Sequence, residues 1–394
     1  MNFEVLKRSH VKRNIIIVIA IVLVLSAIIL TFTRAKYRVT ESMPLLNGTI
    51  NYTLADLNIV AMYLDGSEID TLPDGNYELT SESYCTNEEN VKDDSITLNY
   101  DGSTNTFTIA PFSKKGTKCY LYFEEGASAG DYILASENAP TSTTTDWTGG
   151  TTYYYTGNPN NWIQFGGFYW RIIRINGDGT IRMIYQGTSA NTTGTGTQIG
   201  TSAFNSSADN KTYVGLVYDE STQHGSGQPS TIMTNLNNWY NSNLAKYEED
   251  YIDTGTGFCS DRNMARGYNW SSSTVYYAPY DRQSNGSLQC NELDVLSQDN
   301  GKLLNPIGLL TSDEYVLAGS GNSYLDAGIN YWTMSPFDFF SGYADVFSVT
   351  LNGILASGVV DWTVPGVRPV INLKADTPIL SGDGSSDTPF VITE

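Results

Sequence analysis

The feature that most constrains this chain is an uncharged apolar run close to its N-terminus. The nineteen residues from Ile15 to Thr33 carry no charged side chain. At about 1.5 Å per helical residue, such a run matches a hydrocarbon layer of roughly 30 Å. We therefore expect a transmembrane signal anchor over 14–33, a cytoplasmic tail over 1–13 and a single pass through the cell membrane. The lipid bilayer is then a partner of the N-terminal helix, and the bulk of the chain is extracellular.

A cleaved signal peptide is the alternative interpretation of the same run. Signal peptides have an apolar core of about 7–15 residues followed by a small-residue cleavage site. The run here is longer, and the TFTRAKY that ends it offers no such site. Lys7, Arg8, Lys12 and Arg13 precede the run, which favours a cytoplasmic N-terminus.

Charge and composition narrow the function classes. The 394 residues include 22 Lys+Arg against 42 Asp+Glu, which gives a net charge of −20, and only 2 His. A nucleic-acid partner is excluded on this balance because phosphate recognition needs a basic surface. Two histidines leave little material for histidine-based metal or acid–base chemistry, so we expect no cofactor and no bound metal.

Four cysteines fall in two local groups, Cys85 with Cys119 and Cys259 with Cys290. An even count in an exported chain predicts disulfides, and four cysteines allow three connectivities. Each group lies inside one predicted domain, which favours the two local pairs over either crossed arrangement. Loops of about thirty residues would each stabilise the fold by roughly 3–4 kcal/mol.

Beyond the apolar run, the sequence predicts two domains. Residues 34–126 alternate short apolar runs with Asp-Gly turns, which is typical of a small β-sandwich-like spacer domain. A linker is expected over 127–150, then a ligand-binding domain over 151–374 and a C-terminal tail over 375–394. In the larger domain, Asn176–Gly179 predicts a β-hairpin turn.

Helices are expected in the larger domain over 231–252, with Ser230 or Thr231 as N-cap, and around Thr311–Ala318. Short strands are expected after the second helix, with a turn at Asn352-Gly353.

The larger domain contains four sequence blocks in the order YWRIIRINGDGTIRMIY, NPIGLLTSDEY, YWTMSP and GVRPVINL. In this order they resemble the C-type-lectin-like fold, in the branch shared with formylglycine-generating enzymes. Within that branch the layout is similar to the variable proteins of diversity-generating retroelements, which are bacterial surface proteins. The resemblance covers about 151–374 and implies an α+β C-type-lectin-like domain. The expected fold class is thus an N-terminal transmembrane helix, an all-β sandwich-like domain and that α+β domain.

The resemblance also implies a displayed patch of variable side chains between Trp332–Pro336 and Gly366–Pro369. Adenine mutagenesis of AAC or AAT codons cannot produce Lys, Glu, Gln, Met or Trp, and none of these types occurs from Phe337 to Asp361. Trp362 departs from the pattern, so it is either fixed or outside the varied set.

The residues themselves support a patch of this kind. Aromatic side chains mixed with small polar ones are typical of binding loops, because rings give rigid contact area and small groups give adaptable hydrogen bonds. Residues 337–343 are expected as a displayed loop, whereas Phe347 shares a strand face with Val349 and is as compatible with burial as with display. The candidate ligand-binding residues are Phe337, Asp338, Phe339, Phe340, Ser341, Tyr343, Asp345, Phe347, Ser348, Thr350, Ala356, Ser357, Asp361, Trp362, Thr363 and Val364.

Together these patterns predict a non-catalytic protein of the cell surface, an adhesin or receptor, whose partner is an extracellular protein or glycan. A fixed structural or coat protein is one alternative. A second is an oxidase like the formylglycine-generating enzymes, which use a cysteine pair in the C-terminal part of the fold; no cysteine follows Cys290 here. A calcium-dependent sugar site is not supported, since Gln228-Pro229-Ser230 lacks the acid of the lectin motif. Arg368 is expected to be a structural arginine rather than an anion ligand.

Overall fold

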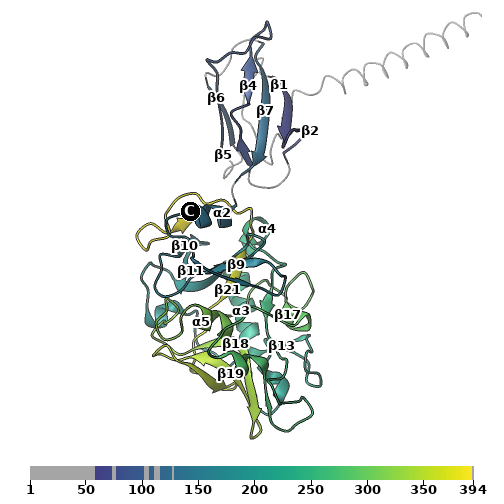
Figure 1. Ribbon diagram of the computed structural model, residues 1–394, viewed down its shortest axis with the longest axis vertical. Helices are drawn as coiled ribbons and strands as arrows, with labels where there is room; N and C mark the ends of the chain where they lie inside the picture. The colour runs from purple at the N-terminus through teal and green to yellow at the C-terminus, as the bar shows by residue number, and fades with distance from the viewer. Residues whose placement is uncertain (1–57, 73–76, 102–105, 111–115, 127, 393–394) are drawn as a thin grey trace, which may run out of the picture. The chain divides into compact units, whose positions relative to one another are not determined.

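The computed structural model describes residues 58–72, 77–101, 106–110, 116–126 and 128–392 (Figure 1). The chain divides into two compact units, with the main boundary between Glu124 and Glu125. The two units are described in turn.

The described part of the first unit is built from β-strands. Its larger sheet has the order β2-β1-β7-β3, with β4 also paired to β7, and β1 and β7 run parallel. A separate β5–β6 hairpin contacts this sheet through Tyr100, whose ring lies edge-on to Phe123 at 5.2 Å. The strands are β1 (Asn58–Leu64), β2 (Ser67–Ile69), β3 (Tyr77–Leu79), β4 (Tyr84–Thr86), β5 (Thr97–Asp101), β6 (Thr106–Ala110) and β7 (Lys118–Glu125).

A disulfide joins Cys85 and Cys119 in the first unit. The two cysteines lie directly opposite each other on the antiparallel strands β4 and β7, with Cα atoms 4.0 Å apart. Both are buried, as are Met62, Leu121 and Phe123 of the same sheet. The predicted local pairing of these cysteines is confirmed.

The second unit is organised around a seven-stranded sheet of order β21-β12-β11-β10-β22, in which β9 pairs with β11 and β8 with β9. The long strands β11 and β12 form the hairpin that Asn176–Gly179 predicted, and almost all of their side chains are buried. The strands are β8 (Ser142–Thr145), β9 (Thr151–Tyr154), β10 (Trp162–Phe165), β11 (Phe168–Ile175), β12 (Ile181–Gly187), β21 (Val370–Leu373) and β22 (Phe390–Val391).

A second, four-stranded sheet of order β16-β18-β19-β20 lies in the part of this unit remote from the C-terminus (Figure 1). Its strands are β16 (Val275–Tyr276), β18 (Tyr331–Phe340), β19 (Tyr343–Val349) and β20 (Leu355–Val359). Two small ladders complete the strand content, β13 (Val217–Tyr218) with β14 (Gln228–Pro229) and β15 (Phe258–Cys259) with β17 (Val295–Leu296).

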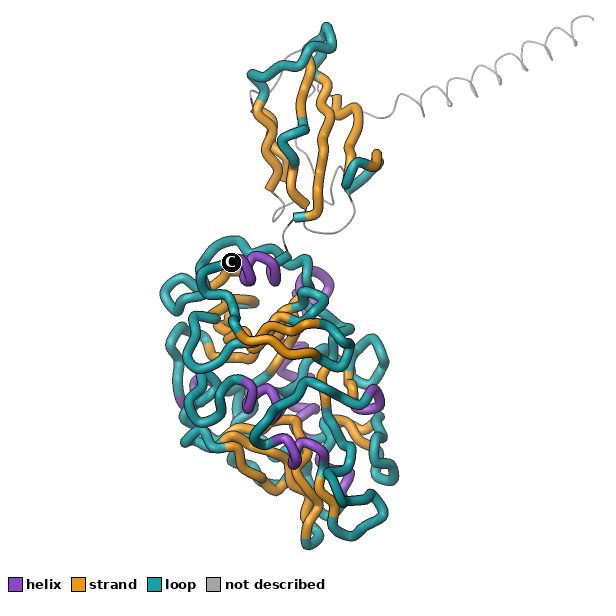
Figure 2. Tube along the Cα trace, viewed as in Figure 1, coloured by secondary structure: helices purple, strands orange, loops and turns teal. Residues whose placement is uncertain are grey.

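Helices are few and short, and loops connect most strands (Figure 2). The helix α3 begins after the N-cap Ser230, whose hydroxyl accepts from the Met233 amide, and α5 begins with a complete capping box between Thr311 and Glu314. The α-helices are α2 (Ala129–Ala135), α3 (Thr231–Asn243), α4 (Glu248–Tyr251) and α5 (Ser312–Leu317). The 3₁₀ turns are η1 (Gly194–Thr197), η2 (Lys211–Val214), η3 (Ala245–Tyr247), η4 (Ala278–Arg282) and η5 (Glu292–Asp294).

The predicted fold class was wrong. The regular secondary structure of the described residues is mostly β-sheet with few helices, so an α+β domain is not what the second unit forms. Their longest helix, α3, has 13 residues, whereas about 20 are needed to cross a bilayer. In the described ranges no helix is long and apolar enough to do so. The predicted span over 14–33 and the predicted tail over 1–13 lie outside the described residues.

Two segments expected outside the domains are packed into the second unit. The expected linker 127–150 carries α2 and β8, and Ala129 and Ile133 of α2 are fully buried in its core. The expected tail 375–394 returns as β22, which pairs parallel with β10 and buries Phe390 and Ile392. Short segments of this kind gain their stability from distant partners, which local composition does not reveal.

Candidate ligand-binding site

The β18–β19 hairpin brings the predicted patch together. A two-residue turn joins the strands, and both Ser341 (φ 54°) and Gly342 (φ 84°) adopt left-handed backbone. This is the primed geometry that matches the twist of a tight hairpin. The stretch 337–343 was predicted as a loop, which was wrong: Phe337–Phe340 belong to β18 and Tyr343 opens β19.

One face of this sheet is packed against the core of the unit. Trp332 and Val346 are fully buried there, and the Trp332 indole donates to the carbonyl of Ser202 at 2.8 Å. A Cβ added to Gly358 would lie 2.8 Å from the Trp332 ring, so only glycine lets the edge strand approach it. Ser348 is buried on this side, with its hydroxyl donating to the carbonyl of Ala356. Its predicted display was wrong.

Phe347 is also fully buried, although it lies outside the main core cluster. Its ring meets the ring of Phe337 edge-on at 4.9 Å. Phe337 in turn contacts Tyr276 of β16 and Tyr280 of η4 at 5.8 and 5.5 Å. Phe337 is therefore the centre of a small aromatic cluster that includes Phe347, and the assignment of Phe347 to a displayed patch was wrong.

The remaining predicted residues differ in exposure. Phe340, Tyr343, Trp362 and Val364 are 54, 58, 41 and 57% exposed, which is unusual for large apolar side chains. Phe337, Phe339, Thr350 and Ala356 are half-buried, and Asp338 is buried. We call the accessible set the display face; it comprises Phe340, Ser341, Tyr343, Asp345, Ser357, Asp361, Trp362, Thr363 and Val364.

An open pocket of about 760 Å³ lies on the display face. This volume falls within the range of small-ligand sites. Two aromatic rings, two carboxylates and three hydroxyl groups, one of them the phenol of Tyr343, are available in it. Its lining residues are Tyr343, Asp345, Ser357, Gly358, Val359, Asp361, Trp362 and Thr363.

The Trp362 side chain packs against a buried tryptophan. Its ring meets the buried ring of Trp332 edge-on, with centroids 6.4 Å apart. Side chains that are fixed before binding lose less entropy when a ligand arrives. This contact also gives Trp362 a packing role, which fits its departure from the restricted set of residue types.

The display face is acidic and lacks a compensating cation. Asp338 and Asp345 lie directly opposite each other on β18 and β19. Burial and the neighbouring Asp345 raise the pKa of Asp338 to about 7, against a hydrogen bond from Tyr276 that favours the charged form. Burial likewise raises the pKa of Asp345; a hydrogen bond from Ser357 opposes this, and Asp361 adds to it.

A second, much smaller cavity of about 10 Å³ lies beside α5, with Trp147, Arg174, Arg182 and Glu314 among its lining residues. Such a volume holds about one water molecule. Glu314 is buried and pairs with Arg174 and Arg182 at 3.3 and 2.5 Å. Burial alone would raise the pKa of Glu314, but the two guanidinium groups outweigh it and hold that pKa below its ordinary value.

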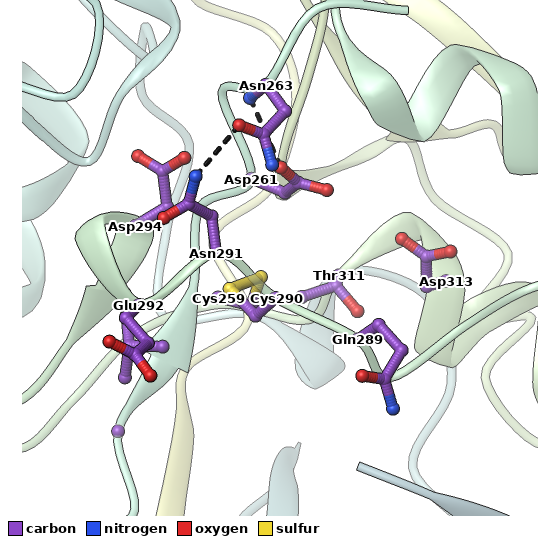
Figure 3. Close-up of a disulfide and its surroundings, with 12 residues drawn as sticks. Cys259, Asp261, Asn263, Gln289, Cys290, Asn291, Glu292, Asp294, Thr311 and Asp313 are labelled. Atoms are coloured by element: carbon purple, nitrogen blue, oxygen red, sulfur yellow. Dashed lines mark hydrogen bonds between the residues drawn. A yellow bond between two sulfur atoms is a disulfide. The ribbon is translucent and has the colours of Figure 1, made fainter. Parts of the chain in front are cut away.

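The second disulfide, Cys259–Cys290, borders this small cavity and is drawn in Figure 3. Its predicted local pairing is confirmed. Polar side chains surround it, and the Asn291 amide donates to Asn263 at 2.9 Å (Figure 3). Across the described ranges no three or more His, Cys, Asp or Glu side chains are placed to hold a metal ion.

Arg368 is fully buried and serves the fold. It donates to the carbonyls of Leu325 and Tyr185 and to the side chain of Gln186, and it lies 4.8 Å from the centroid of the Tyr331 ring. This agrees with its expected structural role.

Sequence reasoning missed Tyr276 and Tyr280, which support Phe337 and Asp338 from strand β16 and turn η4. Both tyrosines lie more than fifty residues before the hairpin, in a Tyr- and Ser-rich loop. Nothing in that local sequence shows that the loop would pair with β18.

Comparison with known proteins gives no relative: no protein-family model, no curated protein and no solved structure matches this chain.

Proposed function

We propose that the second unit is a non-catalytic ligand-binding module that contacts its partner through the display face. The observation that carries this proposal is the exposure of Phe340, Tyr343, Trp362 and Val364 on and beside one open pocket. Soluble proteins seldom leave several large apolar side chains together in water, and where they do the patch is usually an interaction site. Aromatic rings are also the side chains that contribute most to binding energy.

The chemistry of the pocket favours binding over catalysis. Tyr343 and Trp362 supply contact area, and Ser357 and Thr363 supply hydroxyl groups. An activated nucleophile would need a neighbouring base with a third group to orient it, and the pocket lining contains no cysteine, lysine or histidine.

The two disulfides support a site of action outside the cytoplasm. Disulfides persist in oxidising compartments and are rare where thiol-reducing systems operate. Both Cys85–Cys119 and Cys259–Cys290 are formed. An extracellular protein or glycan is therefore the class of partner that we propose.

Variation of the display face among copies of the gene, implied by the resemblance to retroelement-diversified proteins, stays a prediction. A reverse-transcriptase gene beside this one, with a near-copy of its 3′ end that differs only at adenines, would support it. A gene without these neighbours would encode a fixed binding surface.

Selection of ligands against the full chain tests the proposed function. We would select peptides from a random phage-displayed library and probe a glycan array in parallel. Ligands found this way should bind the wild type and lose at least tenfold in affinity with Phe340→Ser or Tyr343→Ser. The matched controls are Tyr132→Ser and Leu293→Ser, which alter exposed side chains elsewhere on the same unit. Ligands whose affinity is unchanged by both Phe340→Ser and Tyr343→Ser would contradict the proposal.

A further inference from the structure

We infer that the open pocket on the display face takes the basic side chain of a protein ligand, an arginine guanidinium or a lysine ammonium. This inference rests on the proposed function and names the chemistry that its ligand must carry. The cation would lie against the rings of Tyr343 and Trp362 and between the carboxylates of Asp345 and Asp361.

The first argument is the composition of the pocket lining. Two aromatic rings and two carboxylates line it, and its lining includes no lysine or arginine. Among the described residues, no ion pair involves Asp338, Asp345 or Asp361. Asp345 repels both Asp338 and Asp361, and a cation placed beside them would offset that repulsion.

The second argument is that the same unit surrounds two of its own arginine side chains with this combination of a carboxylate and an aromatic ring. Arg182 pairs with Glu314 at 2.5 Å and lies 4.5 Å from the centroid of the Phe258 ring. Arg174 pairs with the same carboxylate at 3.3 Å and lies 5.4 Å from the centroid of the Trp147 ring. Each cation thus has one carboxylate and one aromatic ring. The open pocket presents both partners and leaves the place of the cation to a ligand.

Three further arginines of the unit, two of them buried and Arg282 half-buried, are engaged elsewhere. Arg262 pairs with Asp294 at 3.0 Å, and Arg282 pairs with Asp261 and Asp313 at 2.9 and 2.8 Å. Arg171 lies 4.3 Å from the centroid of the Trp162 ring and donates to Asn161. These side chains are fixed by their own partners, which leaves the cation to come from outside.

The third argument favours a peptide as the carrier of the cation. The strand β20, which supplies Ser357, Gly358 and Val359 to the pocket, is the edge strand of its sheet, and among the described strands it pairs with β19 alone. An edge strand offers backbone donors and acceptors to an extended chain. A peptide can therefore use the edge of β20 while its basic side chain enters the pocket.

Titration of the full chain with short peptides tests the inference. The probes are acetyl-Gly-Arg-Gly-amide, its lysine analogue, and a citrulline analogue that keeps the shape of arginine without its charge. Tryptophan fluorescence is the readout, because Trp362 lines the pocket. The arginine or lysine peptide should bind at least fivefold more tightly than the citrulline peptide. The double variant Asp345→Asn/Asp361→Asn should remove that preference, whereas Asp387→Asn, an exposed acid elsewhere on the unit, should keep it.

The outcomes separate this inference from the proposed function. Equal binding of the citrulline peptide, with loss in Tyr343→Ser, overturns the cation and leaves the ligand-binding face intact. Failure of the arginine and lysine peptides to bind up to their solubility limits also overturns the cation, even where library-selected or glycan ligands depend on the face. Displacement of the peptide by calcium, with calcium binding lost in the double variant, would make the pocket a metal site and overturn the inference as well.

Discussion

Two regions of the second unit differ in whether their charged side chains form ion pairs. Around α5, Glu314 is buried with Arg174 and Arg182, and each charge has an opposite charge within reach. On the display face, Asp345 and Asp361 line an open pocket together with Tyr343 and Trp362, and none of the described ion pairs includes them.

The difference separates charges that belong to the fold from charges that are available to a partner. A buried charge without a partner is strongly destabilising, so a fold either pairs it or neutralises it. An accessible carboxylate in a pocket has no such requirement, because water solvates it until a ligand arrives. Substitutions around α5 should therefore mainly lower stability, whereas substitutions on the display face should mainly weaken ligand binding.

The largest expected effect on stability is in the α5 region. Glu314→Gln keeps the shape of the side chain but leaves two buried guanidinium groups without an anion. We expect it to lower the free energy of unfolding by about 3–5 kcal/mol. All seven tryptophans lie in the second unit, so fluorescence-monitored urea unfolding reports on that unit. Glu292→Gln, an exposed control, should stay within about 0.5 kcal/mol of the wild type. A Glu314→Gln protein as stable as the wild type would contradict the stabilising role of the Glu314 ion pairs. Failure of the variant to fold would mean that the loss in free energy of unfolding is larger than expected.

Next in size is the contrast between two phenylalanines of one hairpin. Phe347 is fully buried and Phe340 is 54% exposed. We expect Phe347→Ala to cost about 3–5 kcal/mol and Phe340→Ala to stay within about 0.5 kcal/mol of the wild type. The same urea titration checks both variants. Equal losses at the two positions would show that Phe340 is packed and would remove it from the display face.

A smaller effect, with a distinct pH dependence, is expected at Asp338. Its pKa of about 7 lies above the ordinary value, because of burial and the facing Asp345, with Tyr276 opposing. The stabilisation that the protonated carboxyl provides is complete below about pH 4 and is lost as the pH rises through 7. We therefore expect Asp338→Asn to raise the free energy of unfolding by about 1–2 kcal/mol at about pH 8. This gain is set below the full value that the pKa shift implies, because water that reaches this face screens the charge.

The matched measurement at about pH 4 decides whether that gain comes from ionisation. There the carboxyl is protonated in the folded state and about half protonated in the unfolded state, so the gain from Asp338→Asn should shrink to about 0.5 kcal/mol or less. Glu137→Gln, an exposed control, should be neutral at both pH values. A pH-independent gain would point to packing of the amide instead.

Local sequence was sufficient where local chemistry decides the structure. The turn residues Asn176–Gly179 predicted the β11–β12 hairpin. The helices predicted over 231–252 and around Thr311–Ala318 start within one residue of α3 and α5. The spacing and domain placement of the cysteines predicted both disulfides. In each case the determining groups lie close together along the chain.

Prediction failed where distant partners decide. Alternation predicted that Phe347 and Val349 share a strand face, but it did not show that Phe337, Tyr276 and Tyr280 would form an aromatic cluster with Phe347. The packing of α2 and β22 into the second unit was missed for the same reason. The display face itself was partly foreseen, because exposed aromatics beside small polar residues are a compositional signal, whereas the burial of Ser348 against the core is not.

The most direct measurement of the central claim is hydrogen–deuterium exchange of the full chain with and without a library-selected peptide. If the display face binds the ligand, amides in 340–345 and 355–363 should exchange more slowly in the complex, because the ligand covers the hairpin tip and the edge strand β20. Amides in 309–318, around the paired charges of Glu314, should be unchanged. Protection elsewhere on the second unit, with 340–345 and 355–363 unaffected by a bound peptide, would contradict the account.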